Sequence, residues 1–93
     1  MKPNFENYKK ILITGGSGFI GRNLIVKLLK ETKLYIYNLD KLGYASDNSQ
    51  IQDSLKLFNK KNSRYEIFKV DLFNLEETKK ALKNAQPDLI IHL

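Results

Sequence analysis

The sequence predicts an α/β fold, a doubly wound parallel sheet of which the chain carries the N-terminal half. Short apolar runs alternate with segments in which apolar residues recur at helical spacing. Glycines gather at the point where the first apolar run gives way to the first helical segment. Strands that alternate with helices of this length build a parallel sheet through crossover connections, so the strands are predicted to lie in the order 3-2-1-4.

The first part of the chain supplies two strands and the helix between them. Residues 11–14 form a continuous apolar run, which is typical of a buried parallel strand. Over residues 19–31 apolar side chains recur three or four positions apart, beginning with Ile20, and this predicts a helix with one buried stripe. Residues 33–40 are rich in aromatic and branched side chains, which favours a second strand.

The second part repeats this alternation. In order along the chain we expect a polar turn at 41–48, a helix at 49–60, a strand at 65–70, a helix that ends before Pro87 and a strand at 89–93. Asn74 is predicted to cap the last helix, with Glu77 three residues later as in a capping box. The apolar face of this helix is predicted to begin at Leu75.

Three glycines lie between the first strand and the first helix. Gly15, Gly18 and Gly21 are spaced three apart, and the segment from Gly16 also satisfies the G-x-G-x-x-G pattern. An early glycine allows the tight turn, Gly18 leaves room for a pyrophosphate, and Gly21 allows close packing of the helix. The partial positive charge of the helix N-terminus then faces the phosphates, as in a Rossmann-like dinucleotide site.

Asp40 ends the second strand, nineteen residues after Gly21. A carboxylate at this place accepts hydrogen bonds from both ribose hydroxyls of a dinucleotide and repels a 2′-phosphate, so NAD is favoured over NADP. Lys41 keeps the alternative open, because its ammonium group can bind a phosphate. A second alternative for Asp40 is an ordinary turn aspartate that accepts from its own backbone.

Asp71 ends the third strand in the same way. A side chain at that edge can reach the amino group of an adenine, and the next backbone N–H is also available. The spacing fits nearly as well with a turn or cap aspartate that precedes the third helix.

Composition and charge exclude several classes of protein. The chain has no cysteine and a single histidine, His92, so thiolate and clustered-histidine metal sites are excluded. His92 itself is expected to be a partly buried histidine at a strand end, satisfied by backbone. The net charge is +6, but fourteen of the 16 basic residues are lysines, whereas specific nucleic-acid readers favour arginine.

The whole chain, residues 1–93, is predicted to be one partial domain that begins with a polar leader at 1–8. No apolar run is long enough to span a membrane and the first residues do not resemble a signal peptide, so a cytoplasmic protein is expected.

Several strings resemble the extended short-chain dehydrogenase/reductase family, the NAD-dependent epimerases and dehydratases of nucleotide sugars. They are Ile11–Gly21, Asn38–Ala45, Val70–Leu72 and Pro87–Leu93, which together span nearly all of the chain. The Asp-Lys-Leu-x-Tyr-Ala string that begins at Asp40 is more similar to the 4,6-dehydratases of this family than to its 4-epimerases.

The resemblance implies contacts with NAD beyond the glycine turn. They are Phe19 and Ile20 at the pyrophosphate, Asp40, Lys41, Leu42 and Gly43 around the adenosine ribose, Asp71 and Leu72 at the adenine, and Leu93 at the loop on the nicotinamide side. Gly43 stands where the family often has threonine, which removes a hydroxyl contact.

The same resemblance implies a reaction whose catalytic residues lie outside these 93. Members oxidise C4 of the sugar with bound NAD, lose water across C5–C6 and return the hydride to C6. They require a tyrosine base with a lysine four residues later on one helix, and an Asp–Glu pair. Two Tyr-x-x-x-Lys strings begin here at Tyr37 and Tyr65, but both start in predicted strands, where four positions span about 13 Å. The chain alone is therefore predicted to be inactive.

Four interpretations of the function stay open: the NAD-binding part of a 4,6-dehydratase, part of a 4-epimerase or a UDP-glucose dehydratase, an NAD-binding module without chemistry, and a basic nucleic-acid binder, which the low number of arginines disfavours. The expected partner is a small nucleotide sugar, with no nucleic acid and no membrane, and full-length members are expected to form homodimers. The strand at 89–93 lacks its next neighbour, so self-association of the isolated chain through this edge is expected.

Overall fold

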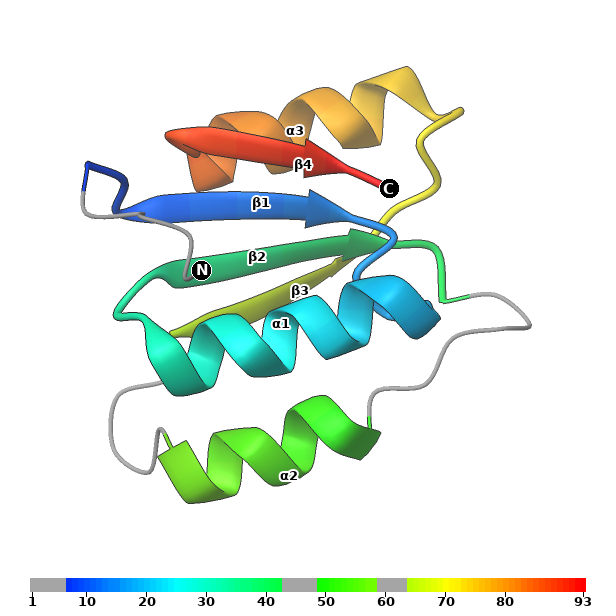
Figure 1. Ribbon diagram of the computed structural model, residues 1–93. Coiled ribbons are helices and arrows are strands. Elements are labelled where there is room, and N and C mark those ends of the chain that lie inside the picture. The colour runs from blue at the N-terminus through cyan, green and yellow to red at the C-terminus, as the bar shows by residue number, and fades with distance from the viewer. Residues whose placement is uncertain (1–6, 43–48, 59–63) are drawn as a thin grey trace.

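Seven elements of secondary structure make up the fold. The computed structural model describes residues 7–42, 49–58 and 64–93, leaving aside the side chains of residues 54, 57 and 58. The elements are β1 (Lys10–Thr14), α1 (Phe19–Glu31), β2 (Tyr35–Asp40), α2 (Ser49–Phe58), β3 (Tyr65–Lys69), α3 (Leu75–Ala85) and β4 (Leu89–His92) (Figure 1). The predicted alternation of strands and helices is confirmed, and bounds differ by about two residues at most.

The four strands form one parallel sheet in the order β3-β2-β1-β4, as predicted. The central strand β1 pairs with β2 and β4, and its Ile11 lies opposite both Ile36 and Leu89. On the far side of β2, Ile36 lies opposite Tyr65 of β3. Because all four strands run the same way, their C-terminal ends share one side of the sheet, here called the carboxyl edge, and their N-terminal ends share the opposite amino edge.

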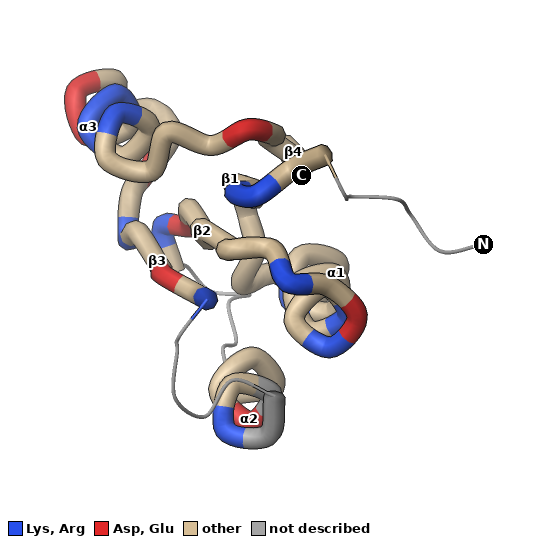
Figure 2. Tube along the Cα trace, turned by 90° about the vertical axis from the view of Figure 1, so that its left-hand side faces the viewer, with Lys and Arg blue, Asp and Glu red and all other residues tan. Residues whose placement is uncertain are grey.

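Helices cover both faces of the sheet (Figures 1 and 2). The face under α1 and α2 carries the larger core, whose buried members are Ile11, Ile13, Ile25, Leu28, Leu29, Leu34, Ile36, Ile51 and Tyr65. The face under α3 carries a smaller core made of Leu12, Tyr37, Leu39, Val70, Ala81 and Ala85. Alternate residues of each strand therefore serve different cores, as expected for a sheet buried on both sides.

Two apolar residues expected at buried positions are exposed. Ile20 in α1 is 70% exposed and Leu75 in α3 is 68% exposed. Both lie in the first turn of a helix, and the buried residues of the two helices begin later, at Gly21 and Ala81. Helical spacing identified the correct side of each helix but not the point along it where burial begins.

Candidate dinucleotide-binding site

The turn between β1 and α1 is built on glycine. Gly15 has a φ of 69°, a left-handed conformation that side chains disfavour, and its N–H donates to the Leu39 carbonyl at 2.9 Å. Gly18 is the N-cap of α1 and offers no side chain to cap the helix. The N–H groups of a first helical turn have no partner within the helix, so this N-terminus is suited to an anion.

The remaining glycines differ in the space around them. A Cβ added to Gly21 would collide with the Gly15 carbonyl oxygen and lie 2.6 Å from the Gly16 Cα, so the helix packs tightly on the turn itself. A Cβ added to Gly18 would meet only the Gly15 oxygen, at 3.4 Å. The turn is therefore closed at Gly21 and open at Gly18, where the sequence predicts the pyrophosphate.

Asp40 lies against this turn. The carboxylate is buried, its Oδ2 accepts from the Ser17 N–H at 3.0 Å, and its Oδ1 accepts from the Leu42 N–H at 2.7 Å. The second bond is the local backbone contact expected of a turn aspartate, and the first joins the tip of β2 to the glycine turn. The glycine turn and Asp40, which the sequence predicts to bind one cofactor, are therefore in direct contact.

The residues after Asp40 form a bend. Leu42 has a φ of 57°, which is uncommon for a residue with a side chain and is a source of strain. Lys41 is exposed beside it. Gly43 lies outside the described residues, so its contact with the ribose stays a prediction.

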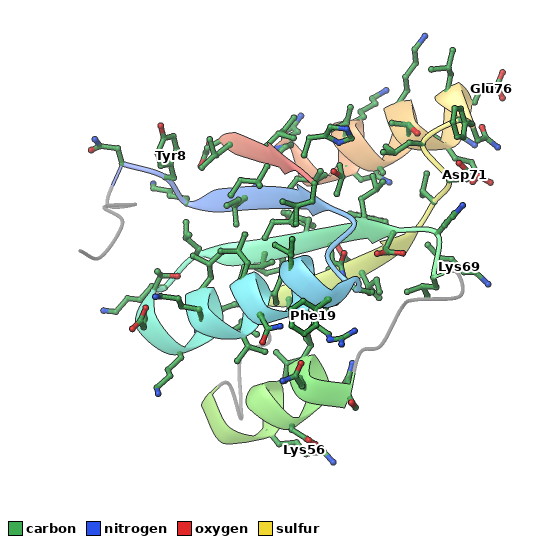
Figure 3. All side chains as sticks on the ribbon, turned by 45° about the vertical axis from the view of Figure 1, so that its right-hand side comes forward. Tyr8, Phe19, Lys56, Lys69, Asp71 and Glu76 are labelled. Carbon is green, nitrogen blue, oxygen red and sulfur yellow. The ribbon has the colours of Figure 1, made fainter. Side chains whose placement is uncertain are left out.

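Asp71 and Leu72 follow β3 at the carboxyl edge, where α1 begins at Phe19. Figure 3 labels Asp71 and Phe19. The Asp71 Oδ1 accepts from the Phe73 N–H at 3.0 Å, and its carbonyl accepts from the Asn74 N–H at 2.8 Å. These are the bonds of a turn aspartate, the alternative that the sequence left open. Leu72 is 40% exposed.

The helix after this turn is capped as predicted. The Asn74 Oδ1 accepts from the Glu77 N–H at 3.1 Å. The Asn74 N–H donates to the Asp71 carbonyl, so Asp71 holds the start of α3.

The end of β4 meets the glycine turn. A Cβ added to Gly15 would lie 3.8 Å from the Leu93 Cβ, and the Leu93 N–H donates to the Thr14 Oγ1 at 3.0 Å. The same hydroxyl lies 2.7 Å from the His92 Nδ1. His92 is exposed and its partner is a side chain, so the expectation of a partly buried histidine bonded to backbone is wrong.

Neither Tyr-x-x-x-Lys string is arranged for catalysis. Tyr37 lies within β2, Tyr65 begins β3, and both rings are buried. Burial raises the pKa of the Tyr65 hydroxyl and also that of Tyr37, whereas a tyrosine base needs a lowered value. On the α3 face the Tyr37 ring stacks on Phe68 with centroids 5.8 Å apart, which makes it part of the core.

Two residues beneath the site, Ser17 and Asn38, were not predicted from the sequence. Ser17 and Asn38 are fully buried, and their side chains are joined by a bond of 3.0 Å from Asn38 Nδ2 to Ser17 Oγ. The sequence contains a signal for Asn38, which is an amide in the middle of an otherwise apolar strand. It lies two residues before Asp40 and therefore on the same face of the strand.

The described ranges, 7–42, 49–58 and 64–93, contain neither a candidate metal site nor a helix that could cross a membrane. They hold no group of three His, Cys, Asp or Glu side chains that could bind a metal ion. Within the same ranges, no helix has the length and apolar character needed to cross a membrane.

The parallel sheet and the glycine turn are typical of dinucleotide-binding proteins, and a comparison with known families identifies the family. Residues 11–93 match the NAD dependent epimerase/dehydratase family. The chain belongs to this family, as the resemblance of its glycine turn and strand ends predicted, and NAD is the family's cofactor.

Particular members narrow the comparison. The dTDP-glucose 4,6-dehydratase of Haemophilus influenzae is 39% identical over 83 residues, which are 89% of this chain and 23% of that protein. The crystal structure of dTDP-glucose 4,6-dehydratase from Bacillus anthracis in complex with NAD matches with a TM-score of 0.76 at 27% identity, over 91% of this chain and 26% of that one. The UDP-Glc/GlcNAc 4-epimerase of Campylobacter jejuni has the same TM-score at 29% identity, over 91% and 24%. The chain thus spans about a quarter of the length of these relatives.

Proposed function

We propose that the glycine turn and Asp40 bind the ADP half of NAD across the carboxyl edge of the sheet. The observation that carries the proposal is the Ser17–Asp40 hydrogen bond of 3.0 Å, because it joins the turn at the open helix N-terminus to a buried acid. The pyrophosphate lies over Gly18 at the start of α1, beside Phe19, and the adenosine ribose hydroxyls donate to the Asp40 carboxylate.

The other predicted contacts complete the proposal. Ile20 lies at the pyrophosphate, Lys41, Leu42 and Gly43 surround the ribose, Asp71 and Leu72 meet the adenine, and Leu93 lies on the nicotinamide side. When bound, NAD supplies a hydride acceptor. The described residues bind and orient it, and the buried Asp40 excludes a 2′-phosphate by charge.

The substrate is proposed from the relatives. The 39% identity with a dTDP-glucose 4,6-dehydratase and the Asp-Lys-Leu-x-Tyr-Ala string from Asp40 support the NAD-binding part of an enzyme that converts dTDP-glucose to its 4-keto-6-deoxy product. The second candidate is a UDP-sugar epimerase or dehydratase, favoured by the match to the Campylobacter jejuni epimerase. The proposal also includes a lyase reaction, a homodimeric assembly of full-length members and a cytoplasmic location.

The 93 residues alone are proposed to have no dehydratase activity. The support is the geometry of the two Tyr-x-x-x-Lys strings, whose tyrosines lie on strands with raised pKa values. Incubation of the chain with dTDP-glucose and NAD is expected to give no 4-keto-6-deoxy product, and genuine turnover contradicts this part of the proposal.

Calorimetric titration with NAD tests the binding site. Asp40→Ala is expected to weaken NAD binding about tenfold or more, because it removes charge-assisted bonds to the ribose. Asp88→Ala is the matched control, since Asp88 also accepts from two backbone N–H groups but lies at the amino edge. Equal losses in both variants, or no NAD binding by the parent chain, overturn the proposal.

The absence of a nucleic-acid partner is tested with the same chain. Binding of NAD is expected to change little with salt. Binding to DNA that falls steeply with salt, without any response to NAD, would instead support the alternative of a basic nucleic-acid binder.

A further inference from the structure

A buried polar chain of three side chains runs beneath the glycine turn. The Asn38 Nδ2 donates to the Ser17 Oγ at 3.0 Å and to the Tyr65 Oη at 2.9 Å. Asn38 and Ser17 are 0% exposed and Tyr65 is 8% exposed. The three residues come from the turn, from the middle of β2 and from the start of β3, so the chain links three separate elements.

Asn38 occupies a position where the sheet would ordinarily place an apolar residue. Its partners across the strands are Ile13 of β1 and Ile67 of β3. Burying an amide among apolar side chains costs free energy unless its polar atoms are bonded, and the Oδ1 of Asn38 is buried without a hydrogen-bond partner. Core packing alone therefore does not account for an asparagine at this position.

The alternation of β2 connects this amide to the cofactor site. Asn38 and Asp40 lie two residues apart on a strand and so face the same side. Both reach Ser17, Asn38 through the serine Oγ and Asp40 through the serine N–H. The Asn38 amide donates to the Ser17 side chain, and the Ser17 N–H in turn donates to one oxygen of the Asp40 carboxylate.

The same amide also fits the backbone of the turn. A Cβ added to Gly16 would collide with the Asn38 Oδ1 and would lie 2.5 Å from its Cγ. The turn thus lies directly on Asn38, which constrains its position both by contact and by hydrogen bonding.

We propose that Asn38 is a positioning residue for the dinucleotide site, holding Ser17 so that the Asp40 carboxylate faces the adenosine ribose. This inference rests on the proposed function, since it concerns how the Asp40 site is shaped. Its consequence is cofactor selectivity: a loosened Asp40 loses its bonds to the ribose hydroxyls and excludes a 2′-phosphate less well, so the preference for NAD over NADP falls.

The test compares NAD and NADP binding by the chain and by Asn38→Leu, a change of similar size without donors. The NAD affinity is expected to fall about tenfold and the ratio of NAD to NADP affinity several-fold. In the unliganded chain, hydrogen exchange at the Ser17 amide is expected to quicken relative to the amides of β1. Loss of folded protein lowers both affinities together and leaves their ratio unchanged.

Tyr65→Phe is the matched variant, because it removes the second bond of Asn38 and leaves the Asn38–Ser17 bond in place. Its melting temperature is expected to fall while the NAD to NADP ratio stays at the parent value. If Asn38→Leu does not fold, Ser17→Ala replaces it, since this variant removes only the Oγ that Asn38 holds, and the same fall in ratio is expected.

The outcomes separate the two proposals. A parent chain that binds no NAD, or binds it without dependence on Asp40, overturns the proposed function and this inference with it. A parent chain that binds NAD through Asp40, together with an unchanged ratio in Asn38→Leu or Ser17→Ala, overturns this inference alone.

Discussion

Charged side chains that bond to the backbone have different roles at the two edges of the sheet. At the amino edge, which faces the viewer in Figure 2, the Arg64 guanidinium donates to the carbonyls of Leu29, Thr32 and Leu34 at 2.8–3.0 Å. At the same edge, in front of β4, the Asp88 carboxylate accepts from the Lys9 and Lys10 N–H groups at 2.8 and 3.0 Å. Each charged group there ties backbone segments of this chain together.

At the carboxyl edge, Asp40 also accepts from two backbone N–H groups, but its surroundings differ. It lies beside an uncapped helix N-terminus, and Phe19, Ile20 and Leu93 are each about half exposed or more. The comparison teaches that a carboxylate bonded to backbone does not define a site by itself. The open glycine turn next to Asp40 distinguishes it from Asp88.

The largest expected effect contrasts two glycines of the turn. Gly21→Ala is expected to lower the free energy of unfolding by about 3 kcal/mol, because its methyl group would collide with the Gly15 carbonyl. Gly18→Ala is expected to cost no more than about 1 kcal/mol, since its Cβ has room, yet to weaken NAD binding. Urea unfolding and NAD titration of both variants decide this, and a Gly18→Ala chain with unchanged NAD affinity contradicts the assignment of the pyrophosphate.

A smaller effect is expected at the amino edge. Arg64→Met removes three hydrogen bonds from a charged donor and is expected to cost about 2 kcal/mol of unfolding free energy. NAD affinity is expected to stay at the parent value, because the change lies at the opposite edge from the turn. Arg64→Lys, which keeps the charge but not the planar fork, is expected to recover only part of the loss. A fully folded Arg64→Met chain with impaired NAD binding would show that the edges are coupled.

The next effect is a dependence of stability on pH. The backbone hydrogen bonds from Lys9 and Lys10 lower the pKa of Asp88 below its ordinary value of 3.8. A group with a lowered pKa in the folded state stabilises the fold above the ordinary pKa, and this contribution disappears as the pH falls through the lower folded pKa. Asp88→Asn is expected to flatten the stability curve below pH 3.8. Parallel acid-unfolding curves for the two chains would falsify the link.

The smallest effect on stability is expected at the exposed edge strand. Ile90 on β4 is 51% exposed, and Ile90→Lys is expected to reduce self-association while changing the unfolding free energy by about 0.5 kcal/mol or less. Leu75→Lys is the control, since Leu75 is also an exposed apolar residue, at 68%, but lies on α3. Sedimentation velocity measures both, and a monomeric parent chain removes the basis for the prediction.

Much of the fold could be predicted because its signals are local. The period of α1 and the apolar run of β1 each lie within one stretch of sequence, and the glycine spacing marks the turn between them. The strand order followed from general rules of parallel sheets, and the position of Asp40 at the end of β2 followed from counting residues.

The polar contacts could not be predicted because they join distant residues. The alternation of β2 shows that Asn38 is buried, but not that its amide meets a hydroxyl 27 residues away on Tyr65. His92 was assigned the wrong environment for the same reason, since its exposure and its bond to Thr14 depend on how two strands end side by side. For Asp71, local spacing fitted a turn role nearly as well as a binding role, whereas for Asp40 the register of strand, turn and helix favoured the binding role and left the turn role open.

The central position of β1 has a consequence for synthesis of the chain. β1 emerges first from the ribosome but pairs on one side with β4, and the Thr14–His92 contact joins residues 78 positions apart. One side of β1 therefore stays unpaired until β4 has been translated. Contacts of such long range slow folding, because the loop must close before they contribute, so the pairing of β4 with β1 is expected to complete this sheet last.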